Sequence, residues 1–309
     1  MTERSEGTIS MTERSEGTIS MAELETPLAP RAVKRSLSPS RAGDFTTCPL
    51  LYRFRTIDRL PEPADPVAAR GTLVHAVLEA LFDVPAPERT LERARELLPD
   101  QWQSIREEDP RLTDLFDSGA DAAAEAEWLT SAEGLLGAYF SVEDPRWLEP
   151  AAREERVAHT LDSGLTLQGI VDRIDISPDG LIRVVDYKTG RSPGPMFEDR
   201  AMSQLKFYAL VVWRTRGVLP TLLQLYYLAD RSVLSYTPTE QDLLVTERRL
   251  TALWQAIADS IERQDFRPST GPLCRFCAHQ PRCPEFGGTP PEFPELQLVD
   301  ARVQSEPGV

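Results

Sequence analysis

Three short runs rich in β-branched and apolar residues, between residues 153 and 189, constrain the fold of this chain most strongly. The runs are REERVAHTL, LTLQGIVDRIDIS and LIRVVDYKT, and turn sequences separate them at 162–164 and at 177–180. Strand-like runs joined by tight turns of this kind predict a three-stranded antiparallel meander. The sequence therefore predicts a sheet at the centre of the fold.

Segments with helical periodicity lie on both sides of this meander. We expect helices at 38–47, 69–82, 198–216 and 239–264, two or three acidic helices within 90–141, and two further strands at 222–229 and 233–236. Ser38 and Thr239 are the expected N-caps of the first and last of these helices, because their hydroxyls can accept a backbone N–H. Helices and strands in this order indicate an α/β fold.

The composition is that of a soluble, acidic globular protein. The chain has 309 residues and a net charge of −15. No apolar run approaches the roughly 18 residues that a membrane span needs. We therefore expect a cytoplasmic protein without a membrane partner. The charge argues against a general nucleic-acid coat, although it leaves room for a local basic groove.

Both ends of the chain are expected to lie outside the fold. Residues 1–10 and 11–20 are identical, and this polar repeat is too short to be a solenoid unit. We interpret residues 1–33 as a disordered or artefactual tail. The predicted domain then covers 34–286, and the Pro- and Gly-rich segment 287–309 is expected to be a second disordered tail.

Two aspartates and a lysine lie on neighbouring strands of the meander. Asp172 is on the middle strand, and Asp186 and Lys188 share a face of the next strand, because alternate strand residues point to the same side. Converging carboxylates repel unless a cation lies between them, and oxygen ligands favour Mg²⁺ or Mn²⁺. Such an ion activates water, and a nearby lysine stabilises the charge that develops on a phosphodiester. Whether Asp172 joins this face depends on the turn, so a surface cluster without function remains the alternative.

The chain has four cysteines, of which three form the short cluster Cys274-x₂-Cys277-x₅-Cys283. In a reducing compartment such a cluster indicates metal binding rather than disulfides. A zinc ion or an iron–sulfur cluster needs a fourth ligand, and both Cys48 and His279 are candidates.

Four motifs in this chain resemble those of the RecB-type PD-(D/E)XK nucleases. GIVDRID and VVDYKTG are similar to the family's Gly-x-x-Asp and Asp-Tyr-Lys motifs, GTLVHAVLE (71–79) to its upstream histidine motif, and QLKFYAL to its Gln-x-x-x-Tyr motif. The motifs occur in the family's order and span about 36–284. The resemblance implies a nuclease core in which a mixed sheet is flanked by helices, with a helical insertion at about 90–141.

The resemblance also implies roles for individual residues. The implied metal ligands are His75, Asp172, Asp186 and the backbone carbonyl of Tyr187. Lys188 would be the catalytic lysine, and Gln204 and Tyr208 would position the DNA strand or the lysine. Without the motifs, a lone helical histidine and an i, i+4 pair are equally typical of structural positions.

A subset of this family, which includes AddB-like proteins and CRISPR-adaptation nucleases, carries a [4Fe–4S] cluster. One cysteine ahead of the core and three after it hold the cluster, and CPLLYRF at Cys48 resembles the leading motif. The resemblance implies a cluster that staples the C-terminal end of the domain through Cys48, Cys274, Cys277 and Cys283. Zinc bound by three cysteines and His279 is the alternative.

The implied function is that of a Mg²⁺- or Mn²⁺-dependent DNA exonuclease that acts on single strands or DNA ends in repair or recombination. DNA phosphates would be contacted by Arg41, Arg53, Arg55, Arg59 and Arg70. No G-x-x-x-x-G-K-[ST] sequence occurs in the chain, so either the protein works alone on exposed ends or single strands, or a separate helicase supplies unwound strands. A non-catalytic DNA-binding scaffold and a zinc-bound interaction module are the alternatives.

Overall fold

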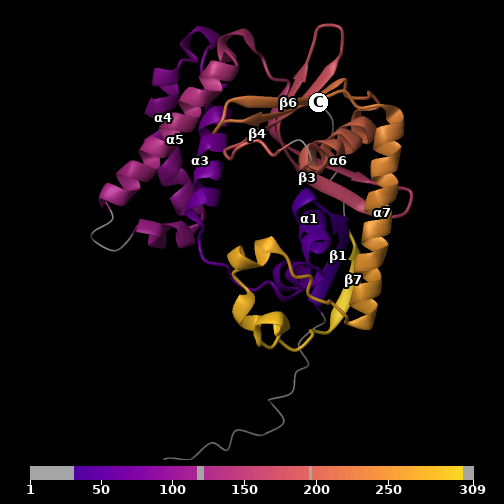
Figure 1. Ribbon diagram of the computed structural model, residues 1–309. Coiled ribbons are helices and arrows are strands. Elements are labelled where there is room, and N and C mark those ends of the chain that lie inside the picture. The colour runs from indigo at the N-terminus through magenta and orange to yellow at the C-terminus, as the bar shows by residue number, and fades with distance from the viewer. Residues whose placement is uncertain (1–30, 117–121, 195–196, 302–309) are drawn as a thin grey trace, which may run out of the picture.

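A computed structural model describes residues 31–116, 122–194 and 197–301 (Figure 1). Within these ranges one mixed sheet has the strand order β6-β5-β4-β3-β1-β7, with β2 paired to β3. The strands are β1 (Arg31–Leu37), β2 (Ala152–Thr160), β3 (Thr166–Ile176), β4 (Ile182–Lys188), β5 (Leu222–Tyr227), β6 (Ser232–Tyr236) and β7 (Leu296–Asp300). The β1–β3, β1–β7 and β4–β5 pairs are parallel, and the other pairs are antiparallel. The predicted α/β fold with a mixed sheet is confirmed.

The predicted meander consists of β2, β3 and β4. The pairing of β3 with β4 covers only residues 173–176 of β3, next to the connecting turn. On the same edge, the other end of β3 pairs with β1 at Thr166 and Leu167. The neighbours of β3 therefore diverge beside residues 168–172, and the candidate site lies there.

Helices cover both faces of the sheet (Figure 1). One face carries α3 (Pro66–Leu81), α4 (Leu91–Glu108) and α5 (Ala122–Val142), and the other carries α6 (Glu198–Arg216) and α7 (Glu240–Arg263). Alternation along β4 divides the core, because Val185 and Tyr187 pack in the first layer and Val184 packs in the second. No helix in the described part of the chain has both the length and the apolar character needed to cross a membrane.

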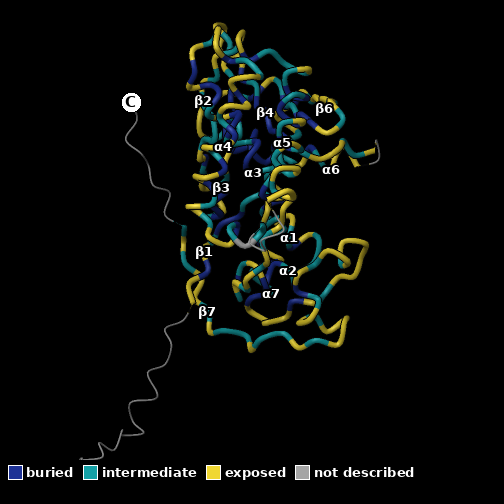
Figure 2. Tube along the Cα trace, turned by 90° about the vertical axis from the view of Figure 1, so that its left-hand side faces the viewer, coloured by how far each residue is buried: buried dark blue, intermediate teal, exposed yellow. Residues whose placement is uncertain are grey.

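Local capping fixes the helix ends where the sequence predicted them. Thr239 Oγ1 accepts from the N–H of Asp242 at 3.2 Å while the Asp242 carboxylate accepts from the N–H of Thr239 at 2.8 Å, which forms a capping box. Ser38 likewise caps α1 (Pro39–Thr47), and Cys48 separates it from α2 (Pro49–Tyr52). Figure 2 shows α1, α2 and α7 grouped beside β1 and β7.

The structure differs from the expected tails at their inner ends. β1 begins at Arg31, and β7 pairs with it in parallel from Arg31↔Leu296 to Arg35↔Asp300. The segment before β7 is held by Phe293, whose ring stacks on that of Phe266 with centroids 6.0 Å apart. Local patterns could not reveal this pairing, because its partners are short and lie at opposite ends of the chain. The duplicated residues 1–20 lie outside the described residues.

Candidate active site

Three carboxylates line up across the meander, one from each strand. The paired registers stop at Arg173↔Val185 on the β4 side and skip Glu154 between Arg153↔Arg173 and Glu155↔Val171 on the β2 side. Asp172 therefore lies where its strand separates from its neighbours, with Asp186 and Glu154 next to the last paired residues of β4 and β2. The side chain of Asp172 is 10% exposed and that of Asp186 only 1%. Buried carboxylates this close repel one another, which makes the row suited to a cation.

His75 of α3 faces this row. Its Nδ1 lies 3.4 Å from Asp172 Oδ2 and 3.6 Å from Glu154 Oε1, and its Nε2 lies 2.9 Å from the carbonyl oxygen of Tyr187. The backbone N–H of Tyr187 donates to Asp172 Oδ2 at 2.7 Å. The predicted histidine, aspartate and backbone carbonyl therefore meet in one place.

These groups shift one another's pKa values. Burial, and then the charge of Asp186, raises the pKa of Asp172 to about 7 against the opposing charge of His75. Burial alone would lower the pKa of His75, but its interaction with Glu154 and the charges of Asp172 and Asp186 outweigh burial and raise that pKa to about 9. At neutral pH, His75 and Asp172 therefore bind protons in the metal-free site. A divalent cation that binds there would displace these protons.

Glu154 is a site residue that the sequence analysis missed. Its carboxylate, His75 and Asp172 each offer one ligand atom, and these three atoms lie within 4.8 Å of one another. Its backbone is left-handed, with φ of 42°, whereas the neighbouring Glu155 pairs with Arg216 at 2.8 Å. The only signal in the sequence is a Glu–Glu doublet on a strand whose register is unknown in advance, and this signal does not distinguish the two.

Lys188 lies beside Asp186 at the end of β4. Its Nζ is 2.6 Å from Asp186 Oδ2, outside hydrogen-bond geometry, and donates to Gln204 Oε1 at 2.9 Å. Gln204 Nε2 donates to Asp186 Oδ1 at 2.9 Å and to the hydroxyl of Tyr208 at 3.3 Å. The i, i+4 pair of α6 thus contacts the lysine and the aspartate instead of lying on the outer surface.

Gly169 allows α6 to approach β3 at this point. A Cβ on Gly169 would lie 2.6 Å from Cε1 of the Tyr208 ring, closer than real Cβ contacts. The glycine of the Gly-x-x-Asp motif is therefore required for the packing of Tyr208 against the strand that carries Asp172.

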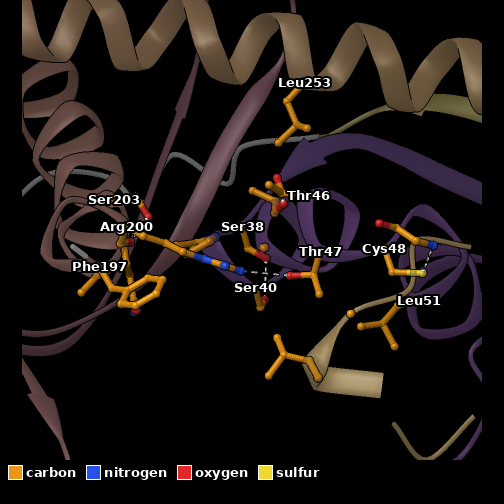
Figure 3. A pocket seen from close by; sticks show the side chains of 18 of the residues that line it. Ser38, Ser40, Thr46, Thr47, Cys48, Leu51, Phe197, Arg200, Ser203 and Leu253 are labelled. Atoms are coloured by element: carbon orange, nitrogen blue, oxygen red, sulfur yellow. Dashed lines mark hydrogen bonds between the residues drawn. The ribbon is translucent and has the colours of Figure 1, made fainter. Parts of the chain in front are cut away.

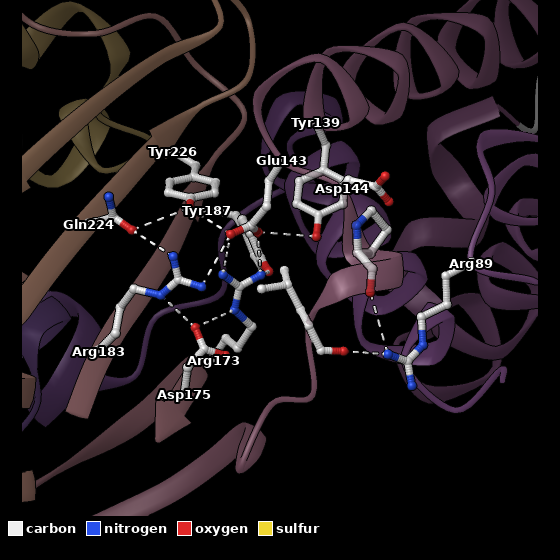
Figure 4. Close-up of polar contacts among 12 residues, drawn as sticks. Arg89, Tyr139, Glu143, Asp144, Arg173, Asp175, Arg183, Tyr187, Gln224 and Tyr226 are labelled. Carbon is white, nitrogen blue, oxygen red and sulfur yellow. Dashed lines mark hydrogen bonds and ion pairs between the residues drawn. The ribbon is translucent and has the colours of Figure 1, made fainter. Parts of the chain in front are cut away.

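Arg173, next to Asp172, points to the opposite face of the sheet (Figure 4). Its buried guanidinium donates to Glu143 at 2.7 Å, to the hydroxyl of Tyr187 at 2.8 Å and to Asp175 at 3.2 Å. The alternation of the strand excludes Asp175 from the metal site, and the structure places Asp175 in this network. This network fixes the side chain of Tyr187 through its hydroxyl group, while the backbone carbonyl of Tyr187 contacts His75.

Two of the arginines expected to contact DNA are engaged within the protein. Arg53 is buried and pairs with Asp58 at 3.0 Å, and Arg55 pairs with both Asp44 and Glu62 at 2.7 Å. The prediction that Arg53 contacts DNA is wrong, because its guanidinium is buried in an ion pair with Asp58. A basic stretch in sequence is thus no guarantee of a basic surface.

The four cysteines line one cavity, although Cys48 is more than 200 residues from the other three. All four are free thiols, and the backbone N–H groups of Ser269 and Gly271 donate to the sulfurs of Cys48 and Cys274 at 3.4 and 3.3 Å. No three of these sulfurs lie within 4.8 Å of one another, the spacing that would suit a single ion.

His279, the alternative zinc ligand, is directed elsewhere. Its Nε2 lies 2.7 Å from Glu62 Oε1, and its ring packs against Phe54 with centroids 5.3 Å apart. It belongs to no group of potential ligand atoms within 4.8 Å among the described residues. The geometry therefore disfavours zinc bound by three cysteines and this histidine.

Comparison with known proteins adds independent information. The sequence profile of the PD-(D/E)XK nuclease superfamily matches residues 36–284. The gene 69 proteins of Mycobacterium phages L5 and D29 are 26% and 27% identical to this chain over 285 and 272 residues, in each case 81% of this chain and 96% of the phage protein. A provisionally assigned exonuclease from Eubacterium rectale has a similar fold, with a TM-score of 0.52 and 14% identity over 79% of this chain and 88% of that chain.

Proposed function

Because this chain belongs to the PD-(D/E)XK nuclease superfamily, we propose that it is a Mg²⁺- or Mn²⁺-dependent DNA exonuclease that acts on single strands or DNA ends in repair or recombination. The observation that supports this proposal is the grouping of Asp172 and Asp186 where β3 and β4 separate, with His75 in contact with Asp172 and Lys188 in contact with Asp186. A cation site beside a lysine supplies the groups that phosphodiester hydrolysis needs.

The residues of the site fit a hard divalent cation. We assign His75, Asp172, Asp186 and the carbonyl of Tyr187 as its ligands, with Glu154 as an additional acid. Asp186 Oδ2 is buried and accepts no hydrogen bond among the described residues, and the Lys188 ammonium group lies 2.6 Å from it. A divalent cation would add a second positive charge at this carboxylate. When bound, such an ion lowers the pKa of a water molecule and neutralises charge on the phosphate.

Lys188 acts on the phosphate during in-line attack by water. Its ammonium group stabilises the charge that develops on the phosphoryl oxygens. Contacts with Asp186 and Gln204 hold the ammonium group in place, so no reorganisation is needed as the charge develops. Tyr208 accepts from Gln204 and fixes its amide, so the pair positions the lysine.

We assign a [4Fe–4S] cluster to Cys48, Cys274, Cys277 and Cys283. The four thiols line one cavity, and two of them accept backbone N–H groups, as cluster thiolates do. The cluster has a structural role, because it ties the start of the domain to its end. A separate helicase is the partner that would feed unwound strands to this enzyme.

Digestion of end-labelled linear and of closed circular single-stranded DNA, with Mg²⁺ or Mn²⁺, tests the proposal. We expect the linear strand to be shortened from one end and the circle to survive. Cleavage of the circle at a comparable rate would contradict the exonuclease assignment. Binding of DNA without cleavage of either substrate would favour the scaffold alternative.

A further inference from the structure

A groove of about 1820 Å³ is lined both by Lys188, Gln204 and Tyr208 and by the four cysteines, so it connects the candidate active site with the cluster site. In Figure 3, Ser38, Ser40 and Thr47 of α1 lie across from Phe197, Arg200 and Ser203 at the start of α6, and Leu253 of α7 lies above them. The groove is therefore built from three helices that the fold brings together around the site.

The lining of this groove is basic although the chain has a net charge of −15. The basic side chains are Lys188, Arg191, Arg200, Lys206 and Arg249. Asp199 is the one acid among the lining residues, and it pairs with Lys206 at 2.7 Å. Arg191 and Arg249 have no ion-pair partner in the described part of the chain, so their charges are available to a ligand.

Hydroxyl groups and exposed rings complete the lining. Arg200 donates to Thr47 Oγ1 at 3.3 Å, so the start of α6 and the end of α1 meet at this point of the lining. Phe197 and Phe286 are each more than half exposed. Cations and hydroxyls bind phosphates, and exposed aromatic rings stack on unpaired bases.

Building on the proposed nuclease function, we infer that this groove is the path of one DNA single strand from the active site toward the cysteine cluster. Arg200 and Arg249 contact its phosphates, and Phe197 stacks on a base. A base-paired duplex hides the faces of its bases from such a ring, so the groove selects single strands over duplex.

Binding of a fluorescent oligothymidylate of about 20 nucleotides, with Ca²⁺ replacing Mg²⁺, tests this path. We expect Arg200→Ala/Arg249→Ala to weaken binding about tenfold and to reduce the slope of log K against log salt by about 1.4, or 0.7 for each lost phosphate contact. The matched control is Arg248→Ala/Arg263→Ala, which removes the same charge from exposed positions of α7 outside the groove lining. This control should bind as the wild type does.

An equal loss of binding in both double variants, or no loss in the groove variant, would overturn the inference. A second variant tests the ring, because Phe197→Ala should weaken binding of oligothymidylate and leave binding of an abasic strand unchanged. Loss on both strands, or on neither, would contradict stacking.

A small phosphodiester, bis(4-nitrophenyl) phosphate, separates this inference from the proposed function. It carries a single phosphodiester and has no further phosphates for Arg200 and Arg249 to contact, so the groove variant should hydrolyse it at the wild-type rate. If the wild type binds DNA through the groove but hydrolyses neither DNA nor the small substrate, the proposed activity fails and the strand path stands. If the wild type hydrolyses both substrates and the groove variant binds normally, the path fails and the activity stands.

Discussion

Glu154 adopts a left-handed backbone, with φ of 42°, in the middle of a strand. For a residue with a Cβ, such a conformation costs on the order of 1–3 kcal/mol. It accompanies a carboxylate that lies within 4.8 Å of ligand atoms of Asp172 and His75. This is the arrangement expected if Glu154 helps to hold the proposed cation.

Glu154→Gln removes this charge and keeps the shape of the side chain. We expect the affinity for Mn²⁺ to fall about 10- to 100-fold, because fewer negative charges hold the ion. Titration of cleavage against Mn²⁺ concentration measures the change. Glu155→Gln is the matched control, because its side chain pairs with Arg216 away from the ligand group. Equal Mn²⁺ requirements for the two variants would remove Glu154 from the site.

At the residue scale, the sequence identified the chemical groups of the site better than it predicted their arrangement in space. The Asp186–Lys188 spacing fixes a shared face, because strand side chains alternate. The position of Asp172 on the same face depends on the register, and that of Glu154 depends on a backbone conformation that no local pattern predicts. The prediction that Arg53 contacts DNA was wrong for the same reason, because the burial of a side chain depends on tertiary packing.

At the element scale, Glu143 ties the helical layer to the sheet. It follows α5 directly and accepts from Arg173 of β3 at 2.7 Å and from the hydroxyl of Tyr226 of β5 at 2.9 Å (Figure 4). Burial would raise the pKa of Glu143, but the hydrogen bond and charge of Arg173, with Arg183, outweigh burial and hold that pKa below its ordinary value.

A carboxyl group whose pKa is lower in the folded protein contributes stability above its unfolded pKa and loses it as pH falls through the folded pKa. We expect Glu143→Gln to lower the free energy of unfolding at pH 7 by about 3 kcal/mol, because it leaves the buried Arg173 short of a partner. Between about pH 5 and pH 3 the variant should lose less further stability than the wild type. Urea unfolding across this range measures both effects.

Glu133→Gln provides the control for this prediction, because its carboxylate is exposed on α5 and lies 3.7 Å from Arg95. It should change neither the stability at pH 7 nor its slope with pH. Parallel loss of stability with falling pH in wild type and Glu143→Gln would contradict the assigned role of Glu143.

Elements defined by local signals could be predicted from sequence. The meander has turn sequences at both connections, α7 has its capping box at Thr239, and α6 follows its helical periodicity from residue 198 to 216. β1 and β7 have no such signal. Each is stabilised by parallel pairing with a segment far away in sequence, so composition alone suggested tails.

At the scale of the whole molecule, cysteines from both ends of the folded chain line one cavity. The proposed cluster on Cys48 and the three later cysteines would close a loop of more than 200 residues. Closing a loop this long would stabilise the fold by about 5 kcal/mol, because it lowers the conformational entropy of the unfolded chain. Cluster binding and folding should therefore be linked.

Cys48→Ser should lose bound iron and unfold at a lower temperature than the wild type. Iron and sulfide content, measured on protein purified without oxygen, should be close to four of each per wild-type chain. His279→Gln distinguishes the two metal assignments, because it should keep its iron. Zinc in place of iron, or loss of metal in the His279 variant, would contradict the cluster.

The measurement that tests the account most directly is the rate at which Lys188→Ala cleaves end-labelled single-stranded DNA with Mn²⁺. Lys34→Ala, an exposed lysine of β1, is the matched control. We expect Lys188→Ala, folded and carrying wild-type iron, to cleave at least about 100-fold more slowly, because it lacks the cation that stabilises the developing charge. Lys34→Ala should cleave at the wild-type rate. A Lys188→Ala protein that cleaves as fast as the wild type would show that the chemistry does not take place at this site.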